Sequence, residues 1–422
     1  AQAVLPHLLA MFREPDNQQV DPGPRRSMEG FLRGAANLVK DAVGAAHEAW
    51  DAAQSQERSA DFGPACSRSA PAVPDAGAPD ELSVFVGSWN LMGQSPSSND
   101  NLSEWLLAGS GPTEVPDIVV VGVQELVALH PAHCVTKAGG DFKRQDDLDE
   151  RILQSLRCRG KYSKVRSVGM IGLYLACFAR DRLEPLVYDV DADRVRTSTE
   201  GPLAGKKGAL AIRFSVGGIA LSFVNVHLPA GQERTEERSA GLRQIVGEAY
   251  QGINLVGGKR PSKLGYKRET QYTMFDHTGA FIFGDFNFRL NIGASELPKK
   301  ASELTPEECC AVLPAFDPSL SGQVDPALAR FTEGEVTFPP TYKYKVGTDV
   351  LDDARVPAWT DRIFSAGHDI KLLHYGAHMN LRASSDHRPV SGLFHVRRAL
   401  TSPKSGPPLP PPDFSPAAAP RE

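Results

Sequence analysis

The stretch AFIFGDFNFRL, residues 280–290, combines an apolar strand with the polar residues that end it. Apolar or small residues lead without interruption to Asp285, and Asn287 follows after one phenylalanine. An apolar run of strand length, bounded by polar residues, is typical of a strand buried on both faces. Active sites of α/β proteins form where polar side chains leave the ends of such strands.

Runs of the same kind recur along the chain, at SVFVGSW (83–89), DIVVVGV (117–123), MIGLYLACF (170–178), ALAIRF (209–214) and ALSFVNVH (220–227). Periodic apolar residues predict helices near 102–107, 147–157 and 233–251. Many buried strands interspersed with a few helices predict a layered α/β sandwich.

Several of these runs end in residues that suit metal binding or proton transfer. The candidates are Asn90, Gln124, Glu125, Asn225, His227, Asp285, Asn287, Asp361, Ser385, Asp386 and His387. We expect them to converge on one crevice, because strand ends of a sheet lie at a common edge.

The types of these residues point to metal-assisted hydrolysis of a phosphate ester. Asn90 and Glu125 offer the oxygen ligands that Mg²⁺ prefers, whereas a cysteine or multi-histidine set for zinc is missing from the sequence. Hydrolysis also needs an oriented water, a carboxylate and donors around the phosphoryl oxygens. An acidic partner such as Asp361 would hold His387 in one tautomer and favour its protonated form.

The composition limits the classes of partner. The chain has 422 residues and a formal net charge of -5, so affinity for phosphate must come from local clusters of charge. Six scattered cysteines without a Cys-x-x-Cys pair favour free thiols in a reducing compartment, and we expect a cytoplasmic protein. The apolar start at 3–12 lacks a basic signal region, although an export signal removed before Ala1 stays an alternative.

Two flanking regions differ in composition from the centre. Residues 1–80 form an extension with a possible amphipathic helix at 28–54 and a linker rich in Ala and Pro. This helix docks on the main domain or frays, or else it binds a membrane or a partner. Residues 398–422 form a Pro-rich tail that we expect to be disordered, with an SH3- or WW-type domain as a possible partner.

The motifs in the centre, residues 81–397, resemble those of the inositol polyphosphate 5-phosphatase family. The segments that carry the resemblance are WNLMG, VGVQE, FVNVHL, GDFNFRL, FPPTYKY, RVPAWTDRIF and SDHRPV. The resemblance implies the four-layer α/β sandwich of the endonuclease/exonuclease/phosphatase superfamily, deoxyribonuclease I-like, with two packed mixed sheets flanked by helices.

The resemblance also implies roles for single residues. It makes Asn90 and Glu125 ligands of Mg²⁺, Asp285 the residue that orients the attacking water with support from Asn287, and His387 the catalytic histidine paired with Asp361. His227 and Asp386 complete the catalytic set. The substrate-binding residues that it implies are Lys207, Tyr342, Lys343, Arg355 and Arg362, with Tyr342 and Lys343 holding a 4-phosphate.

Two departures from the family pattern concern the substrate. The chain reads GKKGA, with Lys206 where the family has an asparagine, and Asp353 stands where the family often has a base. An acidic side chain there would repel a 4-phosphate. In KVRSVGMIGLYLACFAR, which resembles the family's acyl-chain contact, Met170, Ile171 and Leu173 either touch the membrane or belong to a core strand.

These observations lead us to expect Mg²⁺-dependent hydrolysis of the 5-phosphate of a phosphoinositide or a soluble inositol polyphosphate, by direct attack of water. Phosphatidylinositol 4,5-bisphosphate is the first substrate expected, and the protein would then act in the cytoplasm or at the membrane surface. The alternatives are a nuclease of the superfamily, which the acidic net charge disfavours, and an inactive scaffold that acts through its tail. We expect no nucleic-acid partner.

Overall fold

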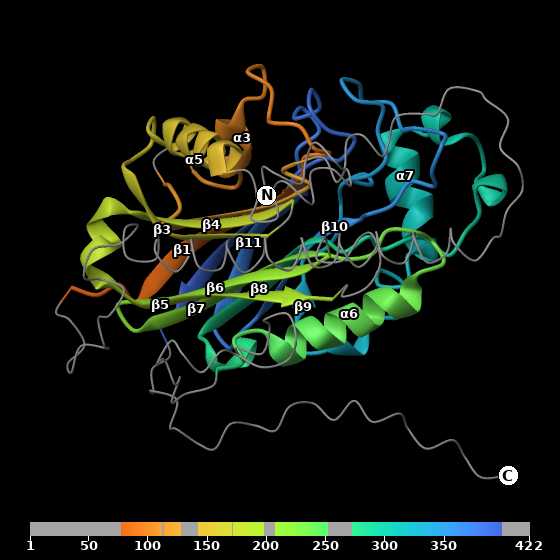
Figure 1. Ribbon diagram of the computed structural model, residues 1–422. Helices are drawn as coiled ribbons and strands as arrows, with labels where there is room; N and C mark the ends of the chain where they lie inside the picture. The colour runs from red at the N-terminus through yellow and green to blue at the C-terminus, as the bar shows by residue number, and fades with distance from the viewer. Residues whose placement is uncertain are drawn as a thin grey trace, which may run out of the picture. The chain divides into compact units, whose positions relative to one another are not determined.

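The computed structural model describes residues 77–111, 114–127, 142–170, 172–197, 207–251 and 272–398 (Figure 1). All of them belong to the compact unit Ala45–Glu422. The helix expected at 28–54, the Pro-rich tail, Lys206 and Ile171 lie outside the described residues.

The first sheet contains six strands in the order β11-β12-β1-β2-β4-β3. Strands β1 and β2 run parallel, and the other neighbours in this sheet are antiparallel. Its strands are β1 Glu81–Asn90, β2 Ile118–Gln124, β3 Tyr162–Met170, β4 Leu173–Arg180, β11 Ile370–Ala377 and β12 Val390–Arg397.

The second sheet also contains six strands, in the order β5-β6-β7-β8-β10-β9. Here β7 and β8 run parallel and the remaining pairs are antiparallel. Its strands are β5 Val187–Arg196, β6 Gly208–Val216, β7 Ile219–His227, β8 Gly279–Asp285, β9 Thr332–Glu333 and β10 Asp361–Ala366.

The two sheets pack face to face, and helices cover their outer faces (Figure 1). Helices α3 (Leu102–Leu106) and α5 (Phe142–Leu156) cover the first sheet, and α6 (Thr235–Glu248) covers the second. The expected four-layer α/β sandwich is therefore confirmed. The remaining helices are α7 Pro306–Val312 and the 3₁₀ helices η2 Asp181–Leu186, η4 Met274–Asp276, η5 Ala294–Glu296, η6 Ala301–Glu303, η7 Leu313–Phe316 and η8 Pro326–Leu328.

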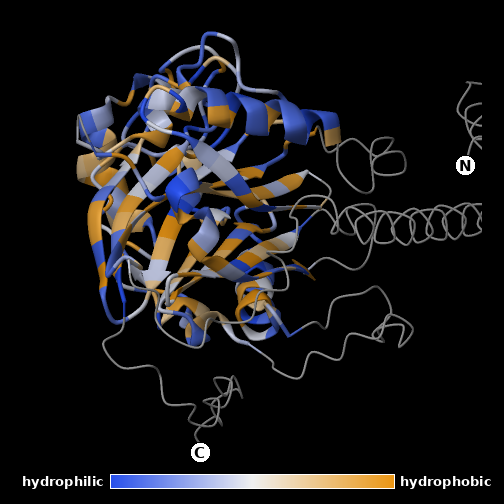
Figure 2. Ribbon diagram, turned by 90° about the vertical axis from the view of Figure 1, so that its left-hand side faces the viewer, coloured by the Kyte–Doolittle hydropathy of each residue, from blue (hydrophilic) through white to orange (hydrophobic). Residues whose placement is uncertain are grey.

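The layer order explains the long apolar runs in the central strands of both sheets. In β1, Val84 and Val86 join the core between the sheets, while Phe85 and Trp89 pack under the helices. Successive side chains of a strand point to opposite faces, and here both faces are covered. Figure 2 shows the hydrophobic residues gathered along the strands.

The predicted elements agree with the observed ones, with differences at their ends. Helix α5 begins five residues before the predicted start at 147, and α6 is shorter at both ends than the predicted 233–251. Of the two alternatives for Met170 and Leu173, membrane contact or a core strand, the structure supports the core strand, because each side chain is only 1% exposed and belongs to the core. No helix in the described part of the chain is long and apolar enough to cross a bilayer.

Candidate active site

The site lies where strand ends of the two sheets meet. His227 ends β7 beside Asp285, which ends β8, and Asp361 begins β10 on the other side of Asp285. Asn90 ends β1 in the other sheet, and its Nδ2 donates a 2.9 Å hydrogen bond to Oδ2 of Asp285. Glu125 follows β2 directly. The strand ends thus bring Asn90, Glu125, His227, Asp285 and Asp361 together.

Asp285 is a buried carboxylate with fixed donors. Its Oδ1 accepts from the backbone N–H of Asn287 at 2.9 Å, and its Oδ2 lies 3.4 Å from Nε2 of His227. Burial alone would raise the pKa of Asp285, but the contact with His227 and the charges of His387 and Lys207 outweigh it and lower the pKa below its ordinary value. Asp285 is therefore ionised and oriented.

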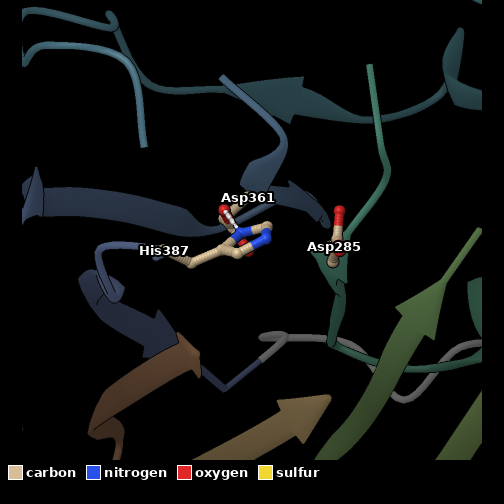
Figure 3. A group of neighbouring side chains, drawn as sticks. All are labelled: Asp285, Asp361 and His387. Atoms are coloured by element: carbon tan, nitrogen blue, oxygen red, sulfur yellow. Dashed lines mark hydrogen bonds and ion pairs between the residues drawn. The ribbon is translucent and has the colours of Figure 1, made fainter. Parts of the chain in front are cut away.

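His387 and Asp361 form a buried pair. Nδ1 of His387 lies 2.9 Å from Oδ2 of Asp361, which also accepts from the hydroxyls of Thr341 and Thr360. Burial would lower the pKa of His387, but the charge and hydrogen bond of Asp361, with Asp285 and Asp386 beyond, raise it to about 9. The other ring nitrogen points toward Asp285 (Figure 3). An ionised carboxylate and a protonated imidazole thus face each other.

His227 has the opposite protonation state. Its side chain is 1% exposed, and Nε2 contacts Nζ of Lys207 and lies 3.7 Å from Oε1 of Glu125. Burial and the charge of Lys207 lower its pKa despite Asp285 and Glu125. A neutral His227 beside Lys207 can accept or donate one hydrogen bond without adding charge.

Tyr342 and Lys343 lie beside His387. The ring of Tyr342 is 4.5 Å from the imidazole of His387, centroid to centroid. Nζ of Lys343 lies 2.9 Å from Oδ2 of Asp386. A phosphate next to the reacting one would therefore find a phenol and an ammonium group on this side of the site.

Two expected substrate-binding residues lie elsewhere. Arg362 is fully buried and its guanidinium binds Glu333, with Asp317 at 3.5 Å, so the geometry contradicts contact with a substrate. Arg362 follows Asp361 along β10 and points to the other face, as strand alternation requires. Arg355 is exposed and the structure gives its side chain no contact with the site.

Arg289 was not predicted as a site residue from the sequence, although it lies in the motif GDFNFRL. Its Nη2 donates to Oδ1 of Asn287 at 2.5 Å, and the guanidinium lies 4.8 Å from the ring centroid of Tyr342. Arg289 therefore links the loop after β8 to the substrate side of the site. The only signal was the motif itself, since a lone arginine after a strand has no distinctive pattern.

The donors fit a hard divalent cation. Among the described residues the carboxylate of Glu125 has no hydrogen bond, and its side chain is 27% exposed at the site. Oδ1 of Asn90 accepts one bond, from the N–H of Met92, and keeps a second lone pair. Carboxylate and amide oxygens are preferred by Mg²⁺ and Ca²⁺.

Asp285, Asp361 and His387 form a second arrangement that could hold a metal ion, with one ligand atom of each within 4.8 Å of the others. The protonation of His387 opposes this, because an imidazolium has no free lone pair for a metal. The positive charge of His387 therefore favours a metal ion on the side of Asn90 and Glu125.

Comparisons with known proteins show the family of this chain. Residues 87–393 match the endonuclease/exonuclease/phosphatase family 2, and the chain belongs to this family. The structure is similar to the inositol polyphosphate 5-phosphatase domain of SPsynaptojanin in complex with inositol (1,4)-bisphosphate and calcium ion. The TM-score is 0.57 and the identity 30%, over 75% of this chain and 84% of that domain. The resemblance to the 5-phosphatases expected from the motifs is confirmed.

The names of two relatives state a substrate. The chain is 34% identical over 323 residues to the type II inositol 1,4,5-trisphosphate 5-phosphatase of Mus musculus. It is 28% identical over 325 residues to a phosphatidylinositol 4,5-bisphosphate 5-phosphatase of Saccharomyces cerevisiae. These alignments cover 74% and 75% of this chain but 29% and 32% of the relatives, so the chain corresponds to about a third of their length.

Proposed function

We propose that this chain hydrolyses the 5-phosphate of phosphoinositides or soluble inositol polyphosphates with Mg²⁺, by direct attack of water. The observation that carries the proposal is the buried Asp285 opposite His387, which is paired with Asp361, with Tyr342 and Lys343 beside them. The names of the two curated relatives support an inositol phosphate as substrate. Phosphatidylinositol 4,5-bisphosphate is the first candidate.

Asp285 acts on the water. Its two oxygens are fixed by Asn90 and by the N–H of Asn287, so the carboxylate can hold a water in line with the phosphorus and accept its proton. The new bond forms between the water oxygen and phosphorus, while the bond from phosphorus to the inositol oxygen breaks and this oxygen takes up a proton from solvent to leave as a hydroxyl.

His387 acts on the phosphoryl group. Its imidazolium, held by Asp361, donates a hydrogen bond and positive charge to the phosphoryl oxygens, on which charge accumulates. Lys207, whose ammonium group contacts Nε2 of neutral His227, contributes a second positive charge on the opposite side. These residues stabilise the transition state without forming a covalent intermediate.

Asn90 and Glu125 would hold the Mg²⁺. Asp386 would belong to the acidic residues that surround the ion and the phosphate. When bound, the ion supplies positive charge to the phosphate and the leaving oxygen. Tyr342 and Lys343 would bind the 4-phosphate, and Lys207 would meet another part of the substrate.

We also propose a domain organisation and a cellular location for this protein. Residues 81–397 form the catalytic domain, 1–80 an extension and 398–422 a tail for an SH3- or WW-type domain. The protein acts in the cytoplasm and at a phosphoinositide membrane surface.

The test is phosphate release from a panel of inositol phosphates and phosphoinositides, with Mg²⁺ and with a chelator. We expect release from substrates with a 5-phosphate only, and only with Mg²⁺. Cleavage of DNA without phosphate release would favour a nuclease, and inactivity on the whole panel would favour a scaffold.

A further inference from the structure

Arg144 of α5 contacts the backbone of both loops that carry the expected metal ligands. Its Nη1 donates to the carbonyl oxygen of Gly93 at 2.8 Å and to that of Leu126 at 2.8 Å. Gly93 lies three residues after Asn90, and Leu126 directly follows Glu125. One guanidinium group thus joins the loop after β1 to the loop after β2.

The same two loops are also joined by backbone hydrogen bonds. The N–H of Leu91 donates to the carbonyl of Gln124 at 2.8 Å, and that of Gly93 to the carbonyl of Glu125 at 2.7 Å. Glu125 has a positive φ of 51°, an uncommon backbone conformation for a residue with a side chain. The direction of its carboxylate therefore depends on the contacts that hold this turn.

Helix α5 provides a fixed position for Arg144. Leu148, Ile152 and Leu156 of the helix are buried against the outer face of the first sheet. Two turns further along, Arg151 donates through Nη2 to the carbonyl of Ser97 at 2.8 Å. The helix therefore holds the loop after β1 at two points, but only the contact of Arg144 also includes the loop after Glu125.

We infer that Arg144 is a positioning residue that sets the separation of Asn90 and Glu125 and thereby the affinity of the site for Mg²⁺. The inference rests on the proposed function, since it assumes that these two residues hold the ion. Groups that orient metal ligands from behind typically change metal affinity by about 10–100-fold when they are removed.

The direction of the change in Mg²⁺ affinity distinguishes a positioning role of Arg144 from an effect of its charge. A cation near the site repels Mg²⁺, so the loss of charge alone in Arg144→Gln would tighten binding. The loss of the two carbonyl contacts would weaken it. Lys143 is the matched control, because it lies on the same helix, is 81% exposed and pairs with Asp147.

The experiment titrates the full-length chain with Mg²⁺ alone and measures the dissociation constant by calorimetry. We expect about tenfold weaker binding in Arg144→Gln, an intermediate value in Arg144→Lys, and an unchanged or slightly tighter value in Lys143→Gln. In the phosphate-release assay, the Mg²⁺ concentration for half-maximal rate should rise in Arg144→Gln, while kcat at saturating Mg²⁺ should return close to the wild-type value.

Two failures are distinguishable. If the wild-type chain neither binds Mg²⁺ nor releases phosphate, the proposed function falls and this inference with it. If the wild-type chain is active but Arg144→Gln and Lys143→Gln bind Mg²⁺ as it does, only the role of Arg144 is overturned. Should Arg144→Gln not fold, the same comparison with Arg144→Lys decides, since wild-type affinity there would overturn the inference.

Discussion

His387 and Asp361 are joined by a 2.9 Å hydrogen bond between Nδ1 and Oδ2, in a buried part of the site. The hydroxyls of Thr341 and Thr360 donate to the same oxygen and hold the carboxylate of Asp361 in this orientation. The pair raises the pKa of His387 to about 9. His387 is therefore protonated at neutral pH, as the proposed role requires.

This pair predicts the alkaline limit of activity. Since the protonated form of His387 is the active one, kcat should be constant near neutral pH and fall as the pH rises through about 9. In Asp361→Asn the charge that raises the pKa is lost and burial lowers it, so the fall should begin well below pH 9. The measurement is kcat against pH for both proteins, and an identical alkaline limb would contradict the assignment.

The same shift affects stability, with a defined sign. The folded-state pKa of His387 lies above the ordinary value of 6.5, so its stabilising contribution is complete below pH 6.5 and is lost as the pH rises through about 9. Denaturant unfolding at pH 6 and pH 9.5 should therefore show a larger loss of stability in the wild-type protein than in His387→Gln. Equal losses would mean that His387 does not titrate in this window.

Lys343 should determine the preference for a 4-phosphate. Lys343→Ala should raise KM for inositol 1,4,5-trisphosphate by about tenfold, because a charge-assisted hydrogen bond contributes about 1.5–3 kcal/mol. A substrate with a 5-phosphate but no 4-phosphate should be little affected. Lys345→Ala, which removes an exposed lysine two residues away, is the control. Equal effects of Lys343→Ala on both substrates would make Lys343 structural.

The structure changes the expectation for Asp353. Its carboxylate accepts from the N–H and the hydroxyl of Ser302, both at 2.8 Å, and these contacts lower its pKa. Because Ser302 already binds this carboxylate, the repulsion of a 4-phosphate that the sequence suggested for Asp353 is not expected. We expect Asp353→Asn to leave KM for the trisphosphate unchanged.

Arg362 should matter for stability rather than for substrate binding. Arg362→Leu leaves Glu333 and Asp317 without their buried partner, and breaking such a pair costs about 3–5 kcal/mol. Arg382→Leu breaks the exposed pair with Asp349, which should cost about 1 kcal/mol or less. Urea unfolding measures both. A stable Arg362→Leu protein with a raised KM would restore the substrate role expected from the sequence.

The sequence predicted the fold well where strands are buried on both faces. Strands β1, β2, β6, β7 and β8 are continuous apolar runs and were found. Strand β5 was not, because VYDVDADRVR is polar and only partly buried at the edge of its sheet. Strand β11 is also an edge strand, with exposed Leu372 and Leu373, and its pattern contains no clear alternation.

The candidate site was predicted as a set of residues together with one contact, the pairing of His387 with Asp361, but the other contacts were not predicted. Asp361 and Arg362 lie side by side in one motif, and only the direction of β10 decides which of them faces the site. Arg144 and Arg289 act through contacts with distant backbone and side-chain atoms, so no local pattern marks them. Motifs identify the chemistry, whereas packing assigns each charge to a catalytic or a structural partner.

Asp285→Asn tests the central claim most directly. The measurement is kcat for phosphate release from inositol 1,4,5-trisphosphate at saturating Mg²⁺, with Asp353→Asn as the control for an exposed carboxylate and thermal melting as the check of folding. Since Asn cannot accept the proton of the attacking water, we predict a fall of at least about 100-fold in Asp285→Asn and none in the control. A folded Asp285→Asn protein with near wild-type kcat would contradict the account.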